Sequence, residues 1–289
     1  MGRAYPAAGA VFDVERRGAR GQVIADTAGL LPLYRFASLA VFPELVHAVA
    51  TRHGGVSRGP FASLNVSRSV GDASEDVLVN RQRLCQAVGV QPEELVTAGL
   101  VHGTRALPVG PAARGHLMLG TDALVTAASG VPLMLCFADC VPIILYDPVR
   151  RAVGLVHAGW RGTLAGAAVA AVQQMAASYG SRPADLRAAI GPAIGPCCYE
   201  VGPEVVTRVR AVFSEAAPSL LSDLRGDRAH FNLWEANRRL LLAAGVGQVE
   251  VAGLCTVCHR DEFFSHRAGN GRTGRFGVVV MLRAPEGRG

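Results

Sequence analysis

Short apolar runs bounded by glycine, proline or aspartate recur along the chain, and they predict buried strands. The longest run, residues 131–147 (VPLMLCFADCVPIILYD), is interrupted by Ala138, Asp139 and Cys140 and ends at the turn signal Asp147-Pro148. Residues 151–160 (RAVGLVHAGW) predict the next strand, which a short hairpin-like connection joins to the first. Further strands are predicted in LVHAVATR (45–52), DALVTAASG (122–130), DLRAAIGP (185–192), VEVAGLC (249–255) and GRFGVVVMLR (274–283).

Helical patterns alternate irregularly with these strands. Residues 72–89 carry apolar positions at Val77, Leu84 and Val88 and acidic residues in the first turn, which predicts a helix. The alanine-rich residues 161–180 end in glycine and predict a second helix, and two more are predicted over 202–214 and 232–245. The order of elements indicates one mixed-sheet α/β or α+β domain over residues 31–289. Residues 1–30 lack periodicity and are interpreted as an N-terminal extension.

Composition narrows the class of protein. Half of the 289 residues are hydrophobic and 18% are charged, which is typical of a soluble domain. The net charge is +6, but the arginines are scattered and no basic run is interleaved with aromatics, so a nucleic-acid partner is not expected. All 29 cationic side chains are arginine, which excludes a lysine Schiff base, and no Walker signature is present.

Cellular location follows from what the sequence lacks. No secretory signal and no apolar run of membrane-spanning length occur, so a cytoplasmic protein without a membrane partner is expected. The seven cysteines are then expected to stay reduced and to serve packing, metal binding or catalysis. The sequence leaves open whether the protein is a monomer or a homodimer.

Three residues form the strongest candidate for chemistry. Cys140 interrupts the long apolar run, and His157 ends the following strand; if the two strands pair, these side chains come together. His102 lies against a glycine at an expected strand-to-loop boundary. One cysteine and two histidines suit zinc, and three protein ligands leave a fourth position open, as in catalytic sites. However, the spacings of 38 and 17 residues match no short zinc motif, and a buried cysteine is commonly a small apolar residue.

Two other cysteine patterns compete with this set. Cys255-Thr256-Val257-Cys258-His259 matches haem attachment by letter, and its C-x-x-C also suggests a thiol redox pair or half a zinc site. Haem attachment is not expected without an export signal. Cys197 and Cys198 are adjacent, and on a strand their side chains would point to opposite faces, so they are interpreted as core or turn residues.

Eight motifs in order connect the chain to a known family: TRHGGVSRGPFASLN, GDASEDVLVNRQRL, TDALVT, ADCVPIILYD, GLVHAGWRGT, AAIGPAIGPCCYEVGPEV, CT followed by FFSHR, and TGRFG. The set resembles the YfiH-type family, whose members have been described as multicopper polyphenol oxidases or laccase-like proteins and as purine nucleoside phosphorylases. The resemblance covers roughly residues 40–283. It implies a single catalytic domain with a mixed-sheet core flanked by helices, in a layered α/β/β/α sandwich.

The resemblance also implies a site and an activity. A zinc site maps onto His102, Cys140 and His157, and copper is the alternative metal. The implied reaction is phosphorolysis of adenosine, inosine or methylthioadenosine to the base and a ribose 1-phosphate, with an accompanying adenosine deaminase activity. An open zinc would acidify water for attack at C6 of adenine. Members often carry glutamine two residues before the first metal histidine, where this chain has Leu100, which puts a neighbouring contact in doubt.

Phosphorolysis requires cations that orient phosphate, and arginine binds phosphate in a bidentate manner. The candidates are Arg52, Arg161, Arg272 and Arg275, and the backbone of Gly54 and Gly55 could approach an anion. His53 and His266 are candidates for contacting the base or for transferring a proton. Stacking on a purine is a candidate role for Trp160, Phe263 and Phe264, although such aromatics often serve packing. Asp139, beside Cys140, is a candidate for orienting a metal ligand.

Two other functions remain as alternatives. A copper-dependent polyphenol oxidase would need several copper centres, whereas the eight histidines are dispersed without an H-x-H pair. A single Cys-His₂ set could still hold one copper ion. The other alternative is a scaffold or a proofreading protein that acts on peptidoglycan precursors and turns over little nucleoside.

Overall fold

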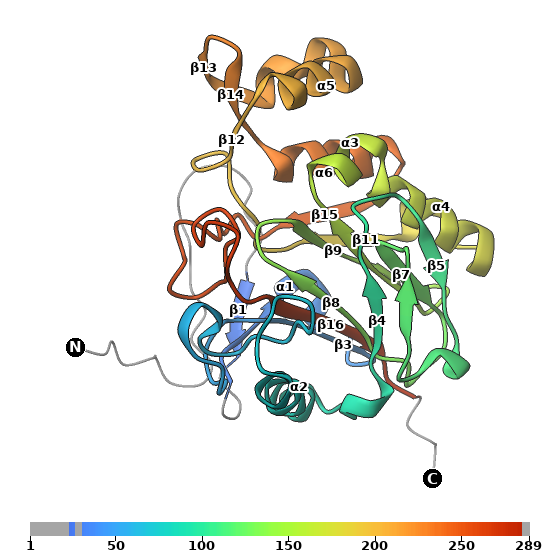
Figure 1. Ribbon diagram of the computed structural model, residues 1–289. Coiled ribbons are helices and arrows are strands. Elements are labelled where there is room, and N and C mark those ends of the chain that lie inside the picture. Colours follow the sequence, from blue (N-terminus) through green and yellow to red (C-terminus); the bar gives the residue numbers. More distant parts are fainter. Residues whose placement is uncertain (1–22, 27–30, 285–289) are drawn as a thin grey trace.

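The computed structural model describes residues 23–26 and 31–284, which form two stacked sheets with helices on the outer faces (Figure 1). The first sheet has seven strands in the order β1-β2-β3-β16-β8-β4-β6. Its strands are β1 (Val23–Asp26), β2 (Leu33–Phe36), β3 (Leu45–Ala50), β16 (Phe276–Leu282), β8 (Leu133–Phe137), β4 (Val96–Gly99) and β6 (Leu117–Leu119). The predicted extension, residues 1–30, lies outside the described residues except for β1, which is an edge strand of this sheet.

The second sheet has six strands in the order β15-β11-β9-β10-β7-β5. Its strands are β15 (Gln248–Val251), β11 (Arg187–Ile190), β9 (Val141–Asp147), β10 (Ala152–Ala158), β7 (Ala123–Thr126) and β5 (Ala106–Pro108). A small third sheet, β12-β14-β13, projects with α5 from the main body (Figure 1). It consists of β12 (Glu200–Val201), β13 (Leu221–Arg225) and β14 (Arg228–Phe231).

Helices cover the outer faces of the sandwich. The helices are α1 (Ala37–Ala40), α2 (Ser74–Val88), α3 (Trp160–Ala165), α4 (Ala167–Tyr179), α5 (Pro203–Phe213) and α6 (Leu233–Ala243). In Figure 1, α2 covers the face of the seven-stranded sheet that points away from the six-stranded sheet. Helices α3, α4 and α6 cover the opposite, outer face of the six-stranded sheet. Short 3-10 turns occur at η1 (Gly59–Phe61), η2 (Pro92–Glu94), η3 (Pro111–Ala113), η4 (Pro183–Asp185) and η5 (Ser214–Ser219).

The central strands β9 and β10 are buried at every position and are largely apolar, because both of their faces are covered. In β9, Ile143 and Leu145 pack into the cluster under the helices, whereas Ile144 packs between the two sheets. In β8, Leu133 lies between the sheets and Met134 belongs to the cluster beneath α2. The predicted fold class, a mixed α/β domain layered α/β/β/α, is therefore confirmed.

Two differences from the predicted elements have physical causes. The single helix predicted over 161–180 is two helices, because Gly166 adopts φ 87° and ends α3 before α4 begins. The β13–β14 hairpin was not predicted, because four of the five residues of β13 are exposed and show no apolar alternation. Within the described residues, no helix has the length and apolar character that a bilayer span requires.

Candidate active site

The β9–β10 hairpin brings the cysteine and one histidine together, as the apolar pattern predicts. The two strands pair antiparallel, with His157 opposite Pro142 and Ala158 opposite Val141. Cys140 directly precedes β9, and His102 follows β4 in a loop of the neighbouring sheet. The ligand atoms of His102, Cys140 and His157 all lie within 4.8 Å of one another.

Asp122 organises this cluster from the residue before β7. Its fully buried carboxylate lies 3.0 Å from His157 Nδ1, and it accepts backbone N–H bonds from His102 at 2.9 Å and from Gly103 at 2.8 Å. Burial alone raises the pKa of Asp122, but the hydrogen bond from His157 and those from the backbone lower it overall. The ionised carboxylate therefore fixes both histidine positions. The motif TDALVT contains Asp122, but the sequence alone assigned no role to it.

The backbone at Gly159 passes close to the side chains of Cys140 and His102. A Cβ atom at Gly159 would lie 3.0 Å from Cys140 Sγ and 3.0 Å from His102 Cδ2, so a larger residue there would push the cluster apart. His102 itself has φ 59°, a left-handed conformation that is uncommon outside glycine. Its loop holds this conformation with the hydrogen bonds to Asp122.

Cys140 and His157 stabilise opposite charges on one another. Burial raises the pKa of Cys140, but the positive charge of His157 and the hydrogen bonds from His102 and His157 outweigh it and lower that pKa to about 6. Burial likewise lowers the pKa of His157, but the Cys140 thiolate and the Asp122 carboxylate raise it to about 9. The thiolate of Cys140 is the form that binds metals, whereas the His157 imidazolium would have to release a proton to become a ligand.

These residues fit a metal ion. A histidine that binds zinc commonly donates its other ring N–H to a carboxylate, and His157 has this arrangement with Asp122. One thiolate and two imidazoles are a donor set that zinc accepts, and such three-ligand sites leave a fourth position for water or substrate. The same donors also occur around single copper ions.

The cluster lies in the wall of a cavity of about 670 Å³, a volume typical of small-molecule sites. Cys140, His157 and His102 contribute to its lining, and so does Leu100, at the position where the resembling family often has glutamine. Basic and polar side chains also line it: Ser67, Arg68, Ser69, Arg81, His266, Arg267 and Arg275. The cavity therefore combines a metal-binding set with a surface suited to an anion.

Arg275 is the only one of these lining arginines that the sequence predicts to bind phosphate. Its guanidinium donates to the carbonyl oxygens of Thr273 and Gly274, each at 2.9 Å, and lies 3.4 Å from His266 Nδ1. Burial lowers the pKa of Arg275, but an arginine remains charged at neutral pH. Sequence reasoning missed Arg68 and Arg81; Arg81 lies within the motif GDASEDVLVNRQRL, whereas Arg68 lies between two motifs and had no signal.

Of the other candidates, His266 and Asp139 also line this cavity, whereas Arg52, His53, Arg161 and Phe264 are not among its lining residues. Arg52 donates to the Ala62 and Arg260 carbonyl oxygens and stacks on Phe264, so it holds loops together. Phe264 is fully buried in the core between the sheets, and its ring lies so close to Gly274 that a Cβ atom there would clash with it. Arg161 is exposed over the Trp160 ring and near Glu204. His53 is half-buried beside Thr51 and is likewise not a lining residue.

Asp139 connects two loops at the cavity rim through hydrogen bonds. Its carboxylate accepts a hydrogen bond from the Thr256 hydroxyl at 2.6 Å and another from the Arg267 backbone N–H at 2.6 Å. It therefore fastens the C-terminal loop beside Cys140, and Asp122 is the carboxylate that contacts the histidine cluster.

These features define an α/β/β/α protein with a mixed histidine–cysteine cluster in a ligand-sized cavity. The chain belongs to the family described as multi-copper polyphenol oxidoreductase laccase, whose sequence model matches residues 46–283. It is 42% identical to a Geobacillus stearothermophilus protein named purine nucleoside phosphorylase YlmD over 84% of this chain and 92% of the relative. A purine nucleoside phosphorylase of Deinococcus radiodurans is 40% identical over 91% of this chain and 97% of the relative.

Solved structures agree with this assignment. The crystal structure of YlmD from Geobacillus stearothermophilus superposes with a TM-score of 0.82 at 39% identity, covering 94% of this chain and all of that one. The hypothetical protein YfiH of Bacillus licheniformis gives a TM-score of 0.85 at 35% identity over 90% of this chain and 99% of that chain. Membership of the YfiH-type family, which the eight motifs predict, is confirmed.

Proposed function

We propose that the protein is a zinc-dependent purine nucleoside phosphorylase of the cytoplasm. Its substrates would be adenosine, inosine or methylthioadenosine with phosphate, and it would also deaminate adenosine. Relatives about 40% identical that bear the name purine nucleoside phosphorylase support an enzyme of this kind. The observation that carries the proposal is that one cavity contains both the His102/Cys140/His157 set and the arginines suited to phosphate.

The arginines supply the phosphate end of the site. Phosphorolysis forms a bond between a phosphate oxygen and C1′ while the bond to the base nitrogen breaks, and the base leaves with that electron pair and gains a proton. Arg275, Arg81 and Arg68 would hold the dianion against C1′, and holding the reactants in place is a large part of catalysis. The Ser67 and Ser69 hydroxyls, 3.1 Å apart in the same lining, would add hydrogen bonds to phosphate oxygens.

The other end of the site would hold the base. A zinc ion bound by His102, Cys140 and His157 would supply a Lewis acid at this wall. Asp122 keeps the His157 ring in one orientation through its hydrogen bond to Nδ1. Tyr199 and Leu135 line the cavity and would exclude water around the purine.

An assay with defined components tests the proposal. Metal-quantified protein is incubated with inosine, adenosine or methylthioadenosine, with and without phosphate, and release of the base and of the ribose 1-phosphate is followed. We expect release that depends on phosphate, and ammonia from adenosine. The proposal is abandoned if none of the three nucleosides shows phosphate-dependent release of the base.

Because the family is described as a multi-copper oxidoreductase, the same experiment also tests copper-loaded protein. Protein loaded with copper is compared with zinc-loaded protein on a phenol substrate and on inosine. In the described part of the chain, only one candidate metal-binding group contains histidine, which disfavours the several copper centres of a laccase. Phenol oxidation without nucleoside phosphorolysis would favour the oxidase instead.

A further inference from the structure

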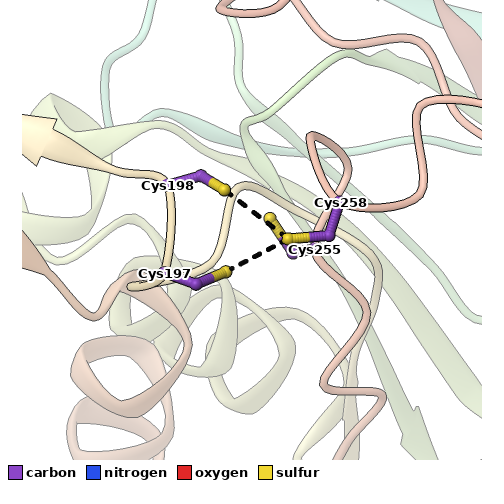
Figure 2. Close-up of side chains that lie close together, drawn as sticks. All are labelled: Cys197, Cys198, Cys255 and Cys258. Atoms are coloured by element: carbon purple, nitrogen blue, oxygen red, sulfur yellow. Dashed lines mark hydrogen bonds between the residues drawn. The ribbon is translucent and has the colours of Figure 1, made fainter.

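A second group of cysteines lies outside the cavity lining described above. Cys197 and Cys198 come from the loop before β12, and Cys255 and Cys258 come from the loop after β15. The four Sγ atoms all lie within 4.8 Å of one another, and Cys258 Sγ is 3.5 Å from the sulfurs of both Cys197 and Cys198. Figure 2 shows all four sulfurs pointing into the space between the two loops.

The side chains of the adjacent residues Cys197 and Cys198 point in the same direction because the two residues lie in a turn. The Gly195 carbonyl oxygen accepts hydrogen bonds from the backbone N–H groups of Cys198 at 2.9 Å and Tyr199 at 3.0 Å. The expectation that Cys197 and Cys198 point to opposite faces is therefore wrong, since it assumed an extended strand. The turn brings both thiols to the C-x-x-C segment, which by itself suggested half of a zinc site.

Four sulfurs at these separations match one tetrahedral ion. A zinc–sulfur bond of about 2.3 Å in a tetrahedron places the sulfurs about 3.8 Å apart. All seven cysteines of the chain are free in the structure, so no disulfide competes for these sulfurs. We propose that Cys197, Cys198, Cys255 and Cys258 form a second metal site, which binds one Zn²⁺ through four thiolates. Four protein ligands close the coordination sphere, which makes this site structural.

The loops are built to meet at this point. Ala193 and Cys255 form a parallel bridge, in which the Thr256 backbone N–H donates to the Ala193 carbonyl oxygen at 3.1 Å. A Cβ atom at Gly195 would lie 3.1 Å from the Cys255 Cβ and 2.6 Å from the Trp234 ring, so only glycine allows the approach. The Gly195 backbone N–H also donates to Cys255 Sγ at 3.3 Å. Backbone N–H groups that donate to sulfur favour the thiolate.

The bound ion would join two walls of the cavity. Tyr199, which lines the cavity, directly follows Cys198, and Thr256 follows Cys255. Thr256 is hydrogen-bonded to Asp139, which also holds the backbone of Arg267, another lining residue. The four-cysteine site thus supports the rim of the cavity without entering it.

Cobalt spectroscopy on the full-length Cys140→Ser variant tests the site. This substitution removes the only thiolate of the His102/Cys140/His157 set, so any thiolate-to-cobalt absorption must come from another site. We expect one tightly bound cobalt with a strong thiolate charge-transfer band and visible bands typical of tetrahedral coordination. The band should disappear when Cys258→Ser is added and persist when Cys85→Ala, a buried cysteine outside both groups, is added instead. A Cys140→Ser protein that binds no cobalt with a thiolate band would overturn the proposal.

Two measurements keep the test valid if Cys258→Ser folds poorly. Cys258→His retains a ligand atom, so it should keep one cobalt with a weaker thiolate band. The Cys140→Ser protein, purified without added metal, should release zinc when a mercurial reagent titrates its thiols. Release of iron in place of zinc, or four thiols that react at once without metal release, would contradict a zinc site.

Discussion

The molecule has two clusters of potential metal ligands that include cysteine. They differ in the number of donor atoms, in the donor elements and in their position relative to the cavity. The His102/Cys140/His157 cluster has three donors, lies in the wall of a cavity, and two of its members sit at the ends of paired strands. The Cys197/Cys198/Cys255/Cys258 cluster has four donors, all sulfur, in two loops. Three donors leave a position for substrate, whereas four close the site.

The difference also shows in what surrounds the sulfur atoms. Cys140 lies beside two imidazoles, which Asp122 holds in position. The Cys258 sulfur lies beside those of Cys197 and Cys198, and Cys255 Sγ accepts a hydrogen bond from the Gly195 backbone N–H. A buried carboxylate that accepts a hydrogen bond from a ligand histidine tunes a reactive metal, whereas a cluster of four thiolates only needs to hold its ion in place.

Replacing one cysteine in each cluster gives the largest expected contrast. Cys140→Ser should remove the metal from the cavity and lower kcat for phosphorolysis by about 10³-fold, because a Lewis acid contributes several kcal/mol. Cys258→Ser should lower kcat by less than about tenfold, since it acts through the cavity rim. Steady-state kinetics with both substrates and metal analysis measure the two effects. Equal losses of kcat in the two variants, with both still folded, would remove the distinction between the sites.

Much of the first cluster could be predicted from the sequence because it depends on local pattern. The apolar run that ends at Asp147-Pro148 specifies the hairpin, and the hairpin brings Cys140 to His157. The role of Asp122 could not be predicted in this way, because the carboxylate reaches His157 through the pairing of β7 with β10, 35 residues along the chain. Long-range pairing of this kind leaves no local signal.

The second cluster shows the opposite outcome. Each half has a visible motif, but Cys197 and Cys258 are separated by 61 residues, and only the packed loops join them. The strand rule failed for the Cys197-Cys198 pair because a turn replaced the strand. The phosphate candidates Arg52 and Arg161 lie outside the cavity lining for a related reason, since a single sequence does not show which arginines face a cavity and which contact loops or solvent.

Asp122→Asn tests whether the first cluster depends on its carboxylate. Asparagine keeps the size but loses the charge, so we expect metal affinity and kcat to fall by about 10- to 100-fold. Metal competition with a chelator and kinetics at saturating substrate measure both quantities. Asp139→Asn is the matched control: it removes a neighbouring carboxylate that holds loops, and metal affinity should change by less than about threefold. A larger effect of Asp139→Asn would reverse the roles.

Arg275→Gln tests the anion side of the same cavity. Loss of a charged hydrogen-bond donor to phosphate should raise the KM for phosphate about tenfold, with a smaller change in the KM for inosine. Arg161→Gln, on the exposed surface beside Trp160, is the control and should leave both KM values unchanged. Arg275→Lys should recover part of the loss because it keeps the charge. An unchanged KM for phosphate in Arg275→Gln would assign phosphate to Arg68 or Arg81 instead.

His47 is a buried histidine that belongs to neither cluster, so its effect on stability does not depend on a bound metal. Its Nε2 accepts the Phe36 backbone N–H at 2.9 Å, and burial, then the charge of Arg35, lowers its pKa from 6.5 to about 4. Between these values the unfolded chain binds a proton that the folded chain does not. Stability from this group is therefore complete above pH 6.5 and is lost as the pH falls towards 4, by about 3 kcal/mol.

Urea unfolding of the wild type and of His47→Gln, with metal content matched, measures this smaller effect. Between about pH 7.5 and about pH 4.5, the wild type should lose about 2 kcal/mol more of its free energy of unfolding than the variant does. The exposed His116→Gln should behave as the wild type. If His47→Gln loses as much stability as the wild type, the acid sensitivity arises from other groups, which include the metal-binding side chains and their carboxylate Asp122. The two clusters would then have to be compared again with chelated protein, in which neither holds an ion.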